Sequence, residues 1–351
     1  MEVRDALARL IARQSLSRSE AEALFDRLMD GELSAAQQAG VLVALASKGE
    51  SPDEIAGAAA AMRRRAVRIP HSTTRVVDTC GTGGDGKGTV NVSTAAALLA
   101  AAGGAAVAKH GNRSVSSRSG SADVLAALGV HLELTPEQLG RCLEEVGIAF
   151  LFAPLLHPAM RAVMPVRREL AVRTLFNVLG PLTNPAGATR QLLGVYSLAL
   201  VEPVGAVLRE LGAEHALVVH GLDGLDELTT TTATRVCEVT PAGTRTFELT
   251  PEELGLPRRA LEQLLGGDPA DNATLLRRVL EGEPGPVADI VALNAGAALF
   301  VAGQAPSLAE GLGQARELQR AGAGARKLDE LGALTRALAA AEAESAGAAG
   351  V

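Results

Sequence analysis

The first seventy residues carry the hydrophobic periodicity of amphipathic helices. Apolar positions recur at helical spacing, as at Ala21, Leu24, Phe25 and Leu28. Three serines each stand three positions before Glu or Gln, the spacing of a capping box; the pairs are Ser17 with Glu20, Ser34 with Gln37 and Ser51 with Glu54. The pattern predicts a first helix over about residues 2–14, then three short capped helices that form a small α-domain.

From residue 75 onward, short apolar runs alternate with helical segments. The runs are "RVVD" (75–78), "AAVAK" (105–109), "QLLGVYS" (191–197) and "HALVVH" (215–220). Helices are expected from about residue 94 to 102, up to Gly129, and over 199–211. This alternation predicts an α/β fold, in which a mostly parallel central sheet is flanked by helices. Ligands of such sheets bind beyond the carboxyl ends of the strands.

Residues 157–187 interrupt this alternation with further helical segments. We therefore predict a helical domain over residues 1–70, completed by helices within about 157–187, and an α/β domain over residues 71–351. The tail "AAAEAESAGAAG" (339–350) is of low complexity and is expected to fray.

Composition narrows the range of partners. The chain is 47% apolar and 21% charged, with a net charge of −7, which disfavours nucleic-acid or anionic-membrane binding. The three cysteines form no C-x-x-C pair, so free thiols in the cytoplasm are expected. The most membrane-like run, residues 92–108, is short and broken by glycines, and the N-terminus does not match a signal peptide.

The stretch "DTCGTGGDGKGT" (78–89) satisfies G-x-G-x-x-G and comes within one residue of a P-loop. No acid follows about twenty positions later, where a dinucleotide-binding unit needs one, and Gly88 replaces the hydroxyl of a P-loop. A turn without a ligand is a further alternative. The nearby "NVST" (91–94) at a helix start, with Lys109 after the next strand, favours phosphate binding.

Two further loops carry polar side chains. The loop "KHGNRSVSSRSGS" (109–121) supplies many anion donors, although a solvated polar loop would look similar. Asp223, Asp226 and Glu227 follow the strand "HALVVH", and this oxygen-rich set suits Mg²⁺, although a surface turn is the alternative. His110 and His157 are candidates to line the site.

Together these motifs resemble the anthranilate phosphoribosyltransferase family. The matching segments are "GELSAAQQAGVLVAL" (31–45), "GTGGD" (81–85), "NVST" (91–94), "KHGNRSVSS" (109–117), "SGSAD" (119–123), "PVRRELAVRTLFNVLGPLTNP" (165–185) and "DGLDE" (223–227). They cover nearly the whole chain in order.

The resemblance implies that anthranilate attacks C1 of phosphoribosyl pyrophosphate (PRPP) and releases pyrophosphate, in tryptophan biosynthesis. It assigns to PRPP the residues Gly81, Gly84, Asp85, Thr89, Asn91, Val92, Ser93, Thr94, Lys109, His110, Gly111, Asn112, Arg113, Ser114, Val115, Ser116, Ser117 and Ser121. It assigns to anthranilate Gly81, Asn112 and Arg167, and to Mg²⁺, with two ions per monomer, Ser93, Asp226 and Glu227.

The resemblance also implies a cytoplasmic homodimer joined through the helical domains. No dedicated catalytic acid or base stands out, so the expected chemistry is positioning and charge stabilisation, to which Lys109 and Arg167 contribute. Two alternatives stay open: a pyrimidine nucleoside phosphorylase, and a non-catalytic, nucleic-acid-binding relative.

Overall fold

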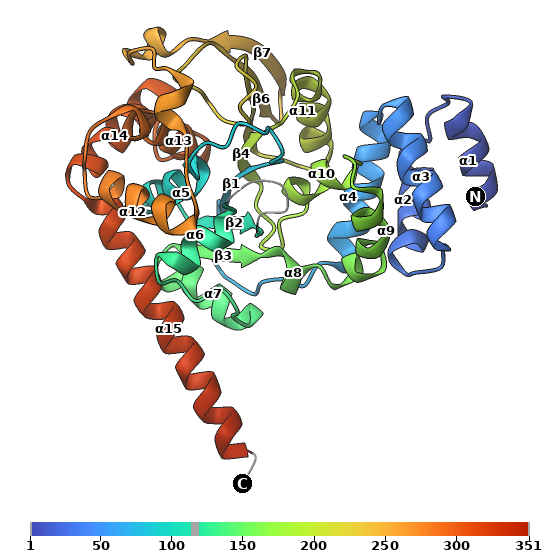
Figure 1. The fold of residues 1–351 in the computed structure, drawn as a ribbon, viewed down its shortest axis with the longest axis horizontal. Coiled ribbons are helices and arrows are strands. Elements are labelled where there is room, and N and C mark those ends of the chain that lie inside the picture. The colour runs from blue at the N-terminus through green and yellow to red at the C-terminus, as the bar shows by residue number, and fades with distance from the viewer. Residues whose placement is uncertain (1, 114–118, 350–351) are drawn as a thin grey trace.

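A computed structural model describes residues 2–113 and 119–349, without side-chain detail beyond residue 344. Four helices begin the chain and lie together at one end of the molecule (Figure 1). They are α1 (Val3–Ile11), α2 (Arg18–Met29), α3 (Ala35–Lys48) and α4 (Pro52–Arg65). Ser17, Ser34 and Ser51 each cap a helix and form the expected capping box. The sequence signals of these helix starts are confirmed.

The rest of the chain builds one seven-stranded sheet in the order β3-β2-β1-β4-β5-β6-β7. The strands are β1 (Val77–Gly81), β2 (Val107–Gly111), β3 (Ile148–Phe152), β4 (Arg190–Gly194), β5 (His215–Gly221), β6 (Thr234–Thr240) and β7 (Gly243–Leu249). The first five strands run parallel, and β6 and β7 add antiparallel at one edge. The predicted α/β class, with a small helical domain and a mostly parallel sheet, is confirmed.

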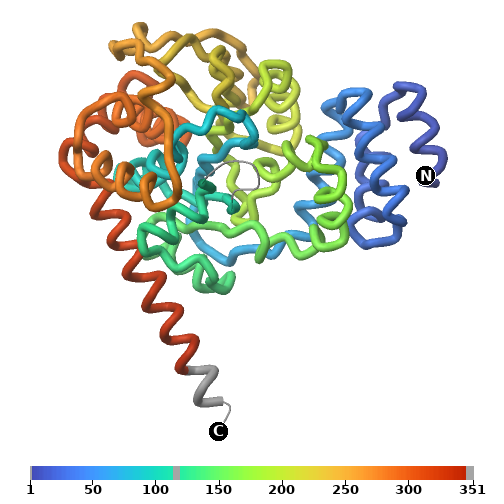
Figure 2. The backbone as a smooth tube through the Cα atoms, in the orientation of Figure 1, coloured from blue at the N-terminus to red at the C-terminus, as the bar shows by residue number. Residues whose placement is uncertain are grey.

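Helices follow the strands as α/β connections require. They are α5 (Val92–Ala102), α6 (Ser121–Ala127), α7 (Pro136–Glu145), α8 (Ala153–Leu156), α9 (Met164–Leu170), α10 (Phe176–Leu179), α11 (Val201–Glu210), α12 (Pro269–Leu280), α13 (Pro286–Ala302), α14 (Leu308–Arg320) and α15 (Ala323–Ala349). Short 3₁₀ turns are η1 (Pro158–Ala162), η2 (Gly180–Leu182), η3 (Leu198–Leu200), η4 (Pro251–Leu254) and η5 (Leu261–Leu264). The backbone tube shows α15 running away from the body of the molecule (Figure 2).

Alternate residues of the central strands feed two different cores. Leu192 and Leu217 belong to the core that includes α5, α13 and α15, whereas Leu193 and Val218 belong to the core that includes α11 and the four N-terminal helices. The alternation follows from the two-residue period of a strand. One face of the sheet therefore shares its core with the helical domain.

The segment after β3 returns to the N-terminal helices. Turn η1 contacts α2 and α4, α9 contacts α3, and α10 contacts α4. The division of the chain near residue 70, with this segment completing the helical domain, stays a prediction. Among the described residues, none of the helices combines the length and apolar character that crossing a bilayer requires.

Some expected boundaries are wrong. Helix α5 begins at Val92, not after Ser93, because Asn91 takes the capping position and Val92 is already buried in the core. The antiparallel pair β6–β7 was not expected. The Ala-rich tail is helical up to Ala349, as the high helix propensity of alanine favours.

Candidate functional site

The carboxyl ends of the five parallel strands lie along one edge of the sheet. The chain passes from β1 to β2 and β3 on one side, then returns to place β4 and β5 on the other side of β1. The connections after β1 and β4 therefore diverge, which is the switch point where ligands bind in open α/β sheets. The glycine loop follows β1, the second polar loop follows β2, and the acidic segment follows β5.

Two glycines let the acidic segment close over the ends of β1 and β4. Gly81 and Gly194 are register partners on these strands. A Cβ on Gly194 would lie 1.6 Å from the carbonyl oxygen of Asp226, and one on Gly81 would lie 2.4 Å from Asp226 Oδ2. No side chain fits at either position, so the two glycines fix the place of Asp226.

The glycine loop is held open by positive φ angles and by contacts at both ends. Gly83, Gly84, Gly86 and Gly88 all have φ between 64° and 74°, a conformation that favours glycine. The N–H of Gly83 donates to Asp226 Oδ2 at 2.8 Å, and Asp85 Oδ1 accepts from the N–H of Lys87. At its far end, Thr89 bridges to Leu265.

The first turn of α5 connects this loop to the acidic segment and to β2. The N–H of Ser93 donates to Glu227 Oε1 at 3.1 Å, and Lys109 Nζ donates to Ser93 Oγ at 3.1 Å and to the carbonyl of Thr79. Three of the expected residues, Ser93, Lys109 and Glu227, are thus brought together. The amide of Ser93, expected to be available to phosphate, is paired with a carboxylate here, as is that of Gly83.

Burial and mutual repulsion perturb the carboxylates of this cluster. Burial first, then the charge of Asp85, raises the pKa of Asp226 to about 7. Burial first, then the charge of Asp226, raises the pKa of Glu227 to about 8. A cation placed between them would relieve this repulsion.

The donor set also suits a magnesium ion. Within the described parts of the chain, no three His, Cys, Asp or Glu side chains form a metal cage by themselves. Mg²⁺ usually binds one or two carboxylates, together with waters and substrate phosphates. Asp226, Glu227 and the Ser93 hydroxyl supply only oxygen atoms, so they fit this mode of binding.

Asp78 is a buried carboxylate that the sequence analysis did not assign. Its Oδ1 accepts from the N–H of His110 at 3.1 Å, and its Oδ2 accepts from Asn184 Nδ2 at 2.8 Å. Strands β1 and β2 pair in register at Val77 and Val107. Beyond that pair, the side chains of Asp78 and Lys109 link the two strands. In the sequence, the position of Asp78 at the end of the apolar run "RVVD" could have indicated a structural role.

The second polar loop is described only in part. Asn91 Nδ2 donates to the carbonyl of Ser119 at 3.2 Å, which connects the start of α5 to this loop. Ser121 Oγ donates to the carbonyl of Asn112, and Arg113 pairs with Asp123 at 3.1 Å. The predicted positions Ser114, Val115, Ser116 and Ser117 lie outside the described residues.

Some predicted positions face the interior. Val92 packs in the core and Thr94 is 1% exposed, so both side chains are buried. His110 and His157 are also buried, with their Nε2 atoms 3.1 Å apart. Burial lowers the pKa of His110 to about 3 and that of His157 to about 4, so both are neutral near pH 7.

Two adjacent arginines of α9 differ in their burial. Arg167 is half-buried with its guanidinium carbon 5.1 Å from the centre of the Phe176 ring, and burial lowers its pKa, whereas Arg168 is exposed. Among the described residues, no hydrogen bond joins Arg167 to the glycine loop or to Asn112. Arg173 makes that connection instead: it donates to the carbonyl of Gly84 and stacks on Tyr196. The sequence motifs assign no role to Arg173.

Comparison with known proteins gives one consistent answer. Residues 4–66 match the glycosyl transferase family, helical bundle domain, and residues 73–325 match the glycosyl transferase family, a/b domain. The chain is 53% identical over 338 residues to the anthranilate phosphoribosyltransferase of Rubrobacter xylanophilus, covering 96% of this chain and 98% of that protein.

Solved structures agree with the sequence relatives. The anthranilate phosphoribosyltransferase of Thermus thermophilus is 52% identical with a TM-score of 0.90, covering 95% of this chain and 99% of that one. The Saccharomyces cerevisiae enzyme is 26% identical in two complexes, each covering 96% of this chain and 98% of that one. One complex contains PRPP and Mg and has a TM-score of 0.87. The other contains 4-fluoroanthranilate and has a TM-score of 0.85.

Proposed function

The chain belongs to the anthranilate phosphoribosyltransferase family, and from this premise we propose that its site transfers the phosphoribosyl group of PRPP to the amine of anthranilate. The products are N-(5-phosphoribosyl)anthranilate and pyrophosphate, in tryptophan biosynthesis. The observation that supports this best is the convergence of Ser93, Lys109, Asp226 and Glu227 between the glycine loop and the acidic segment. Lys109 provides a cation next to an oxygen-rich set that can hold a metal ion, and this combination suits the binding of a pyrophosphate.

Magnesium fits the acidic side of this site. Ser93, Asp226 and Glu227 would hold it, and Asp85 is close enough to raise the pKa of Asp226. These three carboxylates support our finer proposal of two ions per monomer. When bound, Mg²⁺ supplies positive charge that stabilises the departing pyrophosphate.

The remaining residues act by position and charge. In the reaction, a bond forms between the anthranilate nitrogen and C1 of the ribose while the bond from C1 to the pyrophosphate oxygen breaks. Lys109 lies beside the start of α5 and adds positive charge next to the leaving group. The neutral aromatic amine needs no strong base, and the ortho carboxylate of anthranilate can take the released proton. His110 and His157 add no charge near neutral pH.

We assign anthranilate to a contact set that includes Arg167 of α9. Arg167 is half-buried and keeps its planar guanidinium on the Phe176 ring. This fixed plane suits a two-pronged contact with a carboxylate. With Asn112 and Gly81, it forms the proposed anthranilate contact set.

The comparisons favour the transferase over both alternatives. The chain covers 98% of the Rubrobacter protein at 53% identity, and the name of that protein is anthranilate phosphoribosyltransferase. We further propose a homodimer joined through α1–α4 and a cytoplasmic location, in which the free thiols of Cys80, Cys142 and Cys237 stay reduced.

A direct assay tests the proposed reaction. Protein, anthranilate, PRPP and Mg²⁺ are mixed, and the fluorescence of anthranilate is followed; the chain has no Trp, so protein emission interferes little. Fluorescence should fall only when all four components are present. Persistent fluorescence with a correctly folded protein would refute the proposal.

A further inference from the structure

A cavity lies beside the start of β4, at the amino ends of the strands, whereas the candidate site lies at their carboxyl ends. Its volume is about 400 Å³, within the range of small-molecule pockets. The walls come from the end of α4 and the linker after it, the turn at 184–189 before β4, and the end of α11; they include Arg63, Arg68, Ile69, Gln191 and Leu208. Neither the proposed reaction nor the family assignment uses this cavity.

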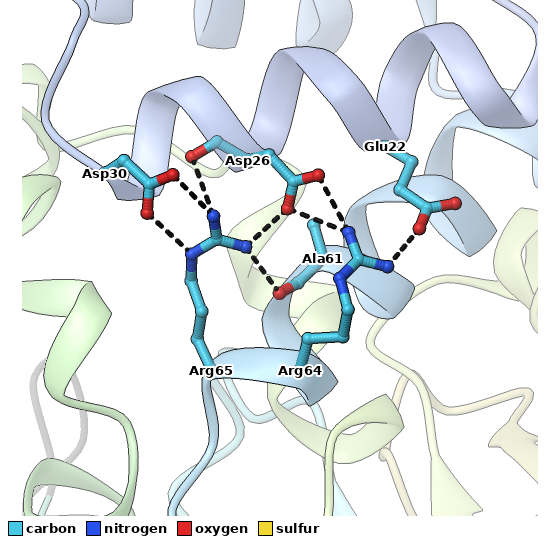
Figure 3. A network of polar contacts seen from close by, with 6 residues as sticks. All are labelled: Glu22, Asp26, Asp30, Ala61, Arg64 and Arg65. Atoms are coloured by element: carbon cyan, nitrogen blue, oxygen red, sulfur yellow. Dashed lines mark hydrogen bonds and ion pairs between the residues drawn. The ribbon is translucent and has the colours of Figure 1, made fainter.

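The charged residues that line the cavity are all basic. Arg63, Arg64 and Arg65 end α4. Arg64 pairs with Glu22 and Asp26, and Arg65 pairs with Asp26 and Asp30, so acids of α2 and the residue after it neutralise these two arginines (Figure 3).

Arg63 points the other way and has no such partner. Its Nε and Nη1 donate to the carbonyl oxygens of Leu182 (2.7 Å) and Leu211 (3.2 Å). Within the described residues, no carboxylate lies within ion-pair distance of Arg63, and Nη2 has no hydrogen-bond partner. Burial lowers the pKa of Arg63, as expected for a charge that is poorly solvated.

Arg68 adds a second unpaired cation. It is exposed, and in the described part of the chain it makes no ion pair or side-chain hydrogen bond. The residues that line the cavity include these two arginines and no Asp or Glu. Two nearby acids have other partners: Glu214 pairs with Arg190 at 3.2 Å, and Asp78 accepts a hydrogen bond from Asn184.

Apart from Asn184, Thr189 and Gln191, the remainder of the lining is apolar or glycine. It includes Ile69, Pro185, Ala186, Leu208 and Leu211. A carboxylate matches the geometry of a guanidinium, and an apolar body matches these aliphatic walls. We propose that this cavity is a second ligand site, which binds a small carboxylate with an apolar body and goes beyond the transferase reaction.

Calorimetric titration of the full chain with hexanoate tests this proposal. Hexanoate should bind, while 1-hexanol, which lacks the charge, and inorganic phosphate, which lacks the apolar body, should bind more weakly. Because walls from α4 and from the α/β part both contact the ligand, hexanoate should also raise the melting temperature. Absence of binding, or tighter binding of phosphate, would overturn the proposal.

Variants locate the binding. Arg68→Gln removes an exposed, unpaired charge and should weaken hexanoate by roughly tenfold, the usual effect of losing a charged hydrogen bond. Ala188→Met should fill part of the cavity and also weaken binding.

Matched controls separate this cavity from the transferase site. Arg209→Gln changes an exposed arginine of α11 that does not line the cavity, so hexanoate should bind as before. Arg167→Ala, which changes the proposed anthranilate contact, should leave hexanoate binding intact. If Arg167→Ala abolishes binding while Arg68→Gln does not, the carboxylate binds at the transferase site and the proposal is wrong.

Discussion

Asp78 shows how one buried side chain can shape a site without touching its proposed ligands. Its carboxylate joins the backbone of β2 to the side chain of Asn184. Asn184 also donates to the carbonyl of Ala108 and accepts from the N–H of Ala186, so its amide cannot turn without losing bonds. Asp78 therefore orients the end of β2, from which Lys109 and His110 project.

Asp78→Asn should destabilise the protein. In either orientation the new amide would place its NH₂ group against a donor, Asn184 Nδ2 or the N–H of His110, and one unsatisfied buried donor costs about 1–3 kcal/mol. Urea denaturation at pH 7 measures this loss, and Asp53→Asn, at an exposed Asp, is the control.

The same variant should alter the dependence of stability on pH. Burial raises the pKa of Asp78 from 3.8 to about 6, so between these values the folded protein holds a proton that the unfolded chain has lost. The contribution of Asp78 to the free energy of unfolding should therefore fall as the pH rises from about 4 to about 6. Asp78→Asn lacks this titration, so the wild-type advantage should shrink over this interval. A difference that is constant with pH would contradict the raised pKa.

Arg167 and Arg168 offer a matched pair in one helix. Arg167 is half-buried on Phe176 and Arg168 is exposed. Arg167→Ala should raise the anthranilate KM at least about tenfold, because it removes a charged contact, while PRPP still binds. Arg168→Ala should leave both KM values nearly unchanged. Steady-state kinetics decide between them, and the reverse ranking would remove Arg167 from the anthranilate contacts.

Among the helices and strands, those with local signals were the most predictable. The capped helices α2–α4 follow from side chains within four residues of each helix start. Strand β3 ("IAFLF") and the hairpin β6–β7, whose strands are joined between Thr240 and Gly243, were not predicted; their places at the two edges of the sheet depend on pairing with β2 and β5. The start of α5 was misplaced because burial of Val92, a tertiary effect, extends that helix.

The same distinction applies to the site. The glycine loop and the acidic segment are visible as short motifs in the sequence. The roles found for Asp78, Asn184 and Arg173 depend on contacts across long separations; Asp78 and Asn184, for example, are 106 positions apart. One sequence carries no trace of such a pairing.

The close packing of the acidic segment on β1 and β4 predicts that two Gly→Ala substitutions will have opposite effects on stability. Gly194→Ala would place a Cβ 1.6 Å from a backbone oxygen, so the segment that carries Asp226 and Glu227 must move. We expect a loss of at least about 2 kcal/mol in unfolding free energy, together with loss of activity. Gly313→Ala in α14 meets no atom within 4 Å and should stabilise the protein by up to about 1 kcal/mol. Equal effects of the two changes would contradict this packing.

Across the whole molecule, one face of the sheet shares a core with the N-terminal helices, while its carboxyl edge carries the candidate site. Burial first, and then repulsion between neighbouring carboxylates, raises the pKa of Asp226 and Glu227, so a bound cation should relieve an unfavourable electrostatic environment. Binding of cation and substrate should therefore stabilise the entire fold, not just the loops.

Thermal denaturation can test this coupling. PRPP with Mg²⁺ at about one hundred times its dissociation constant should stabilise the protein by about 2.7 kcal/mol, and EDTA should reverse most of this. The Asp226→Asn/Glu227→Gln double variant keeps the shape of the site but removes its charge, so it should need more Mg²⁺ for activity. An unchanged Mg²⁺ requirement would show that these carboxylates do not hold the metal.

The stoichiometry of the reaction is the most direct test of the proposed function. Anthranilate consumed and pyrophosphate released are measured in the same sample with PRPP and Mg²⁺. One pyrophosphate should appear for each anthranilate lost, and neither change should occur when PRPP or Mg²⁺ is omitted. Anthranilate that stays constant, or pyrophosphate released at the same rate without anthranilate, would contradict transfer of the phosphoribosyl group to its amine.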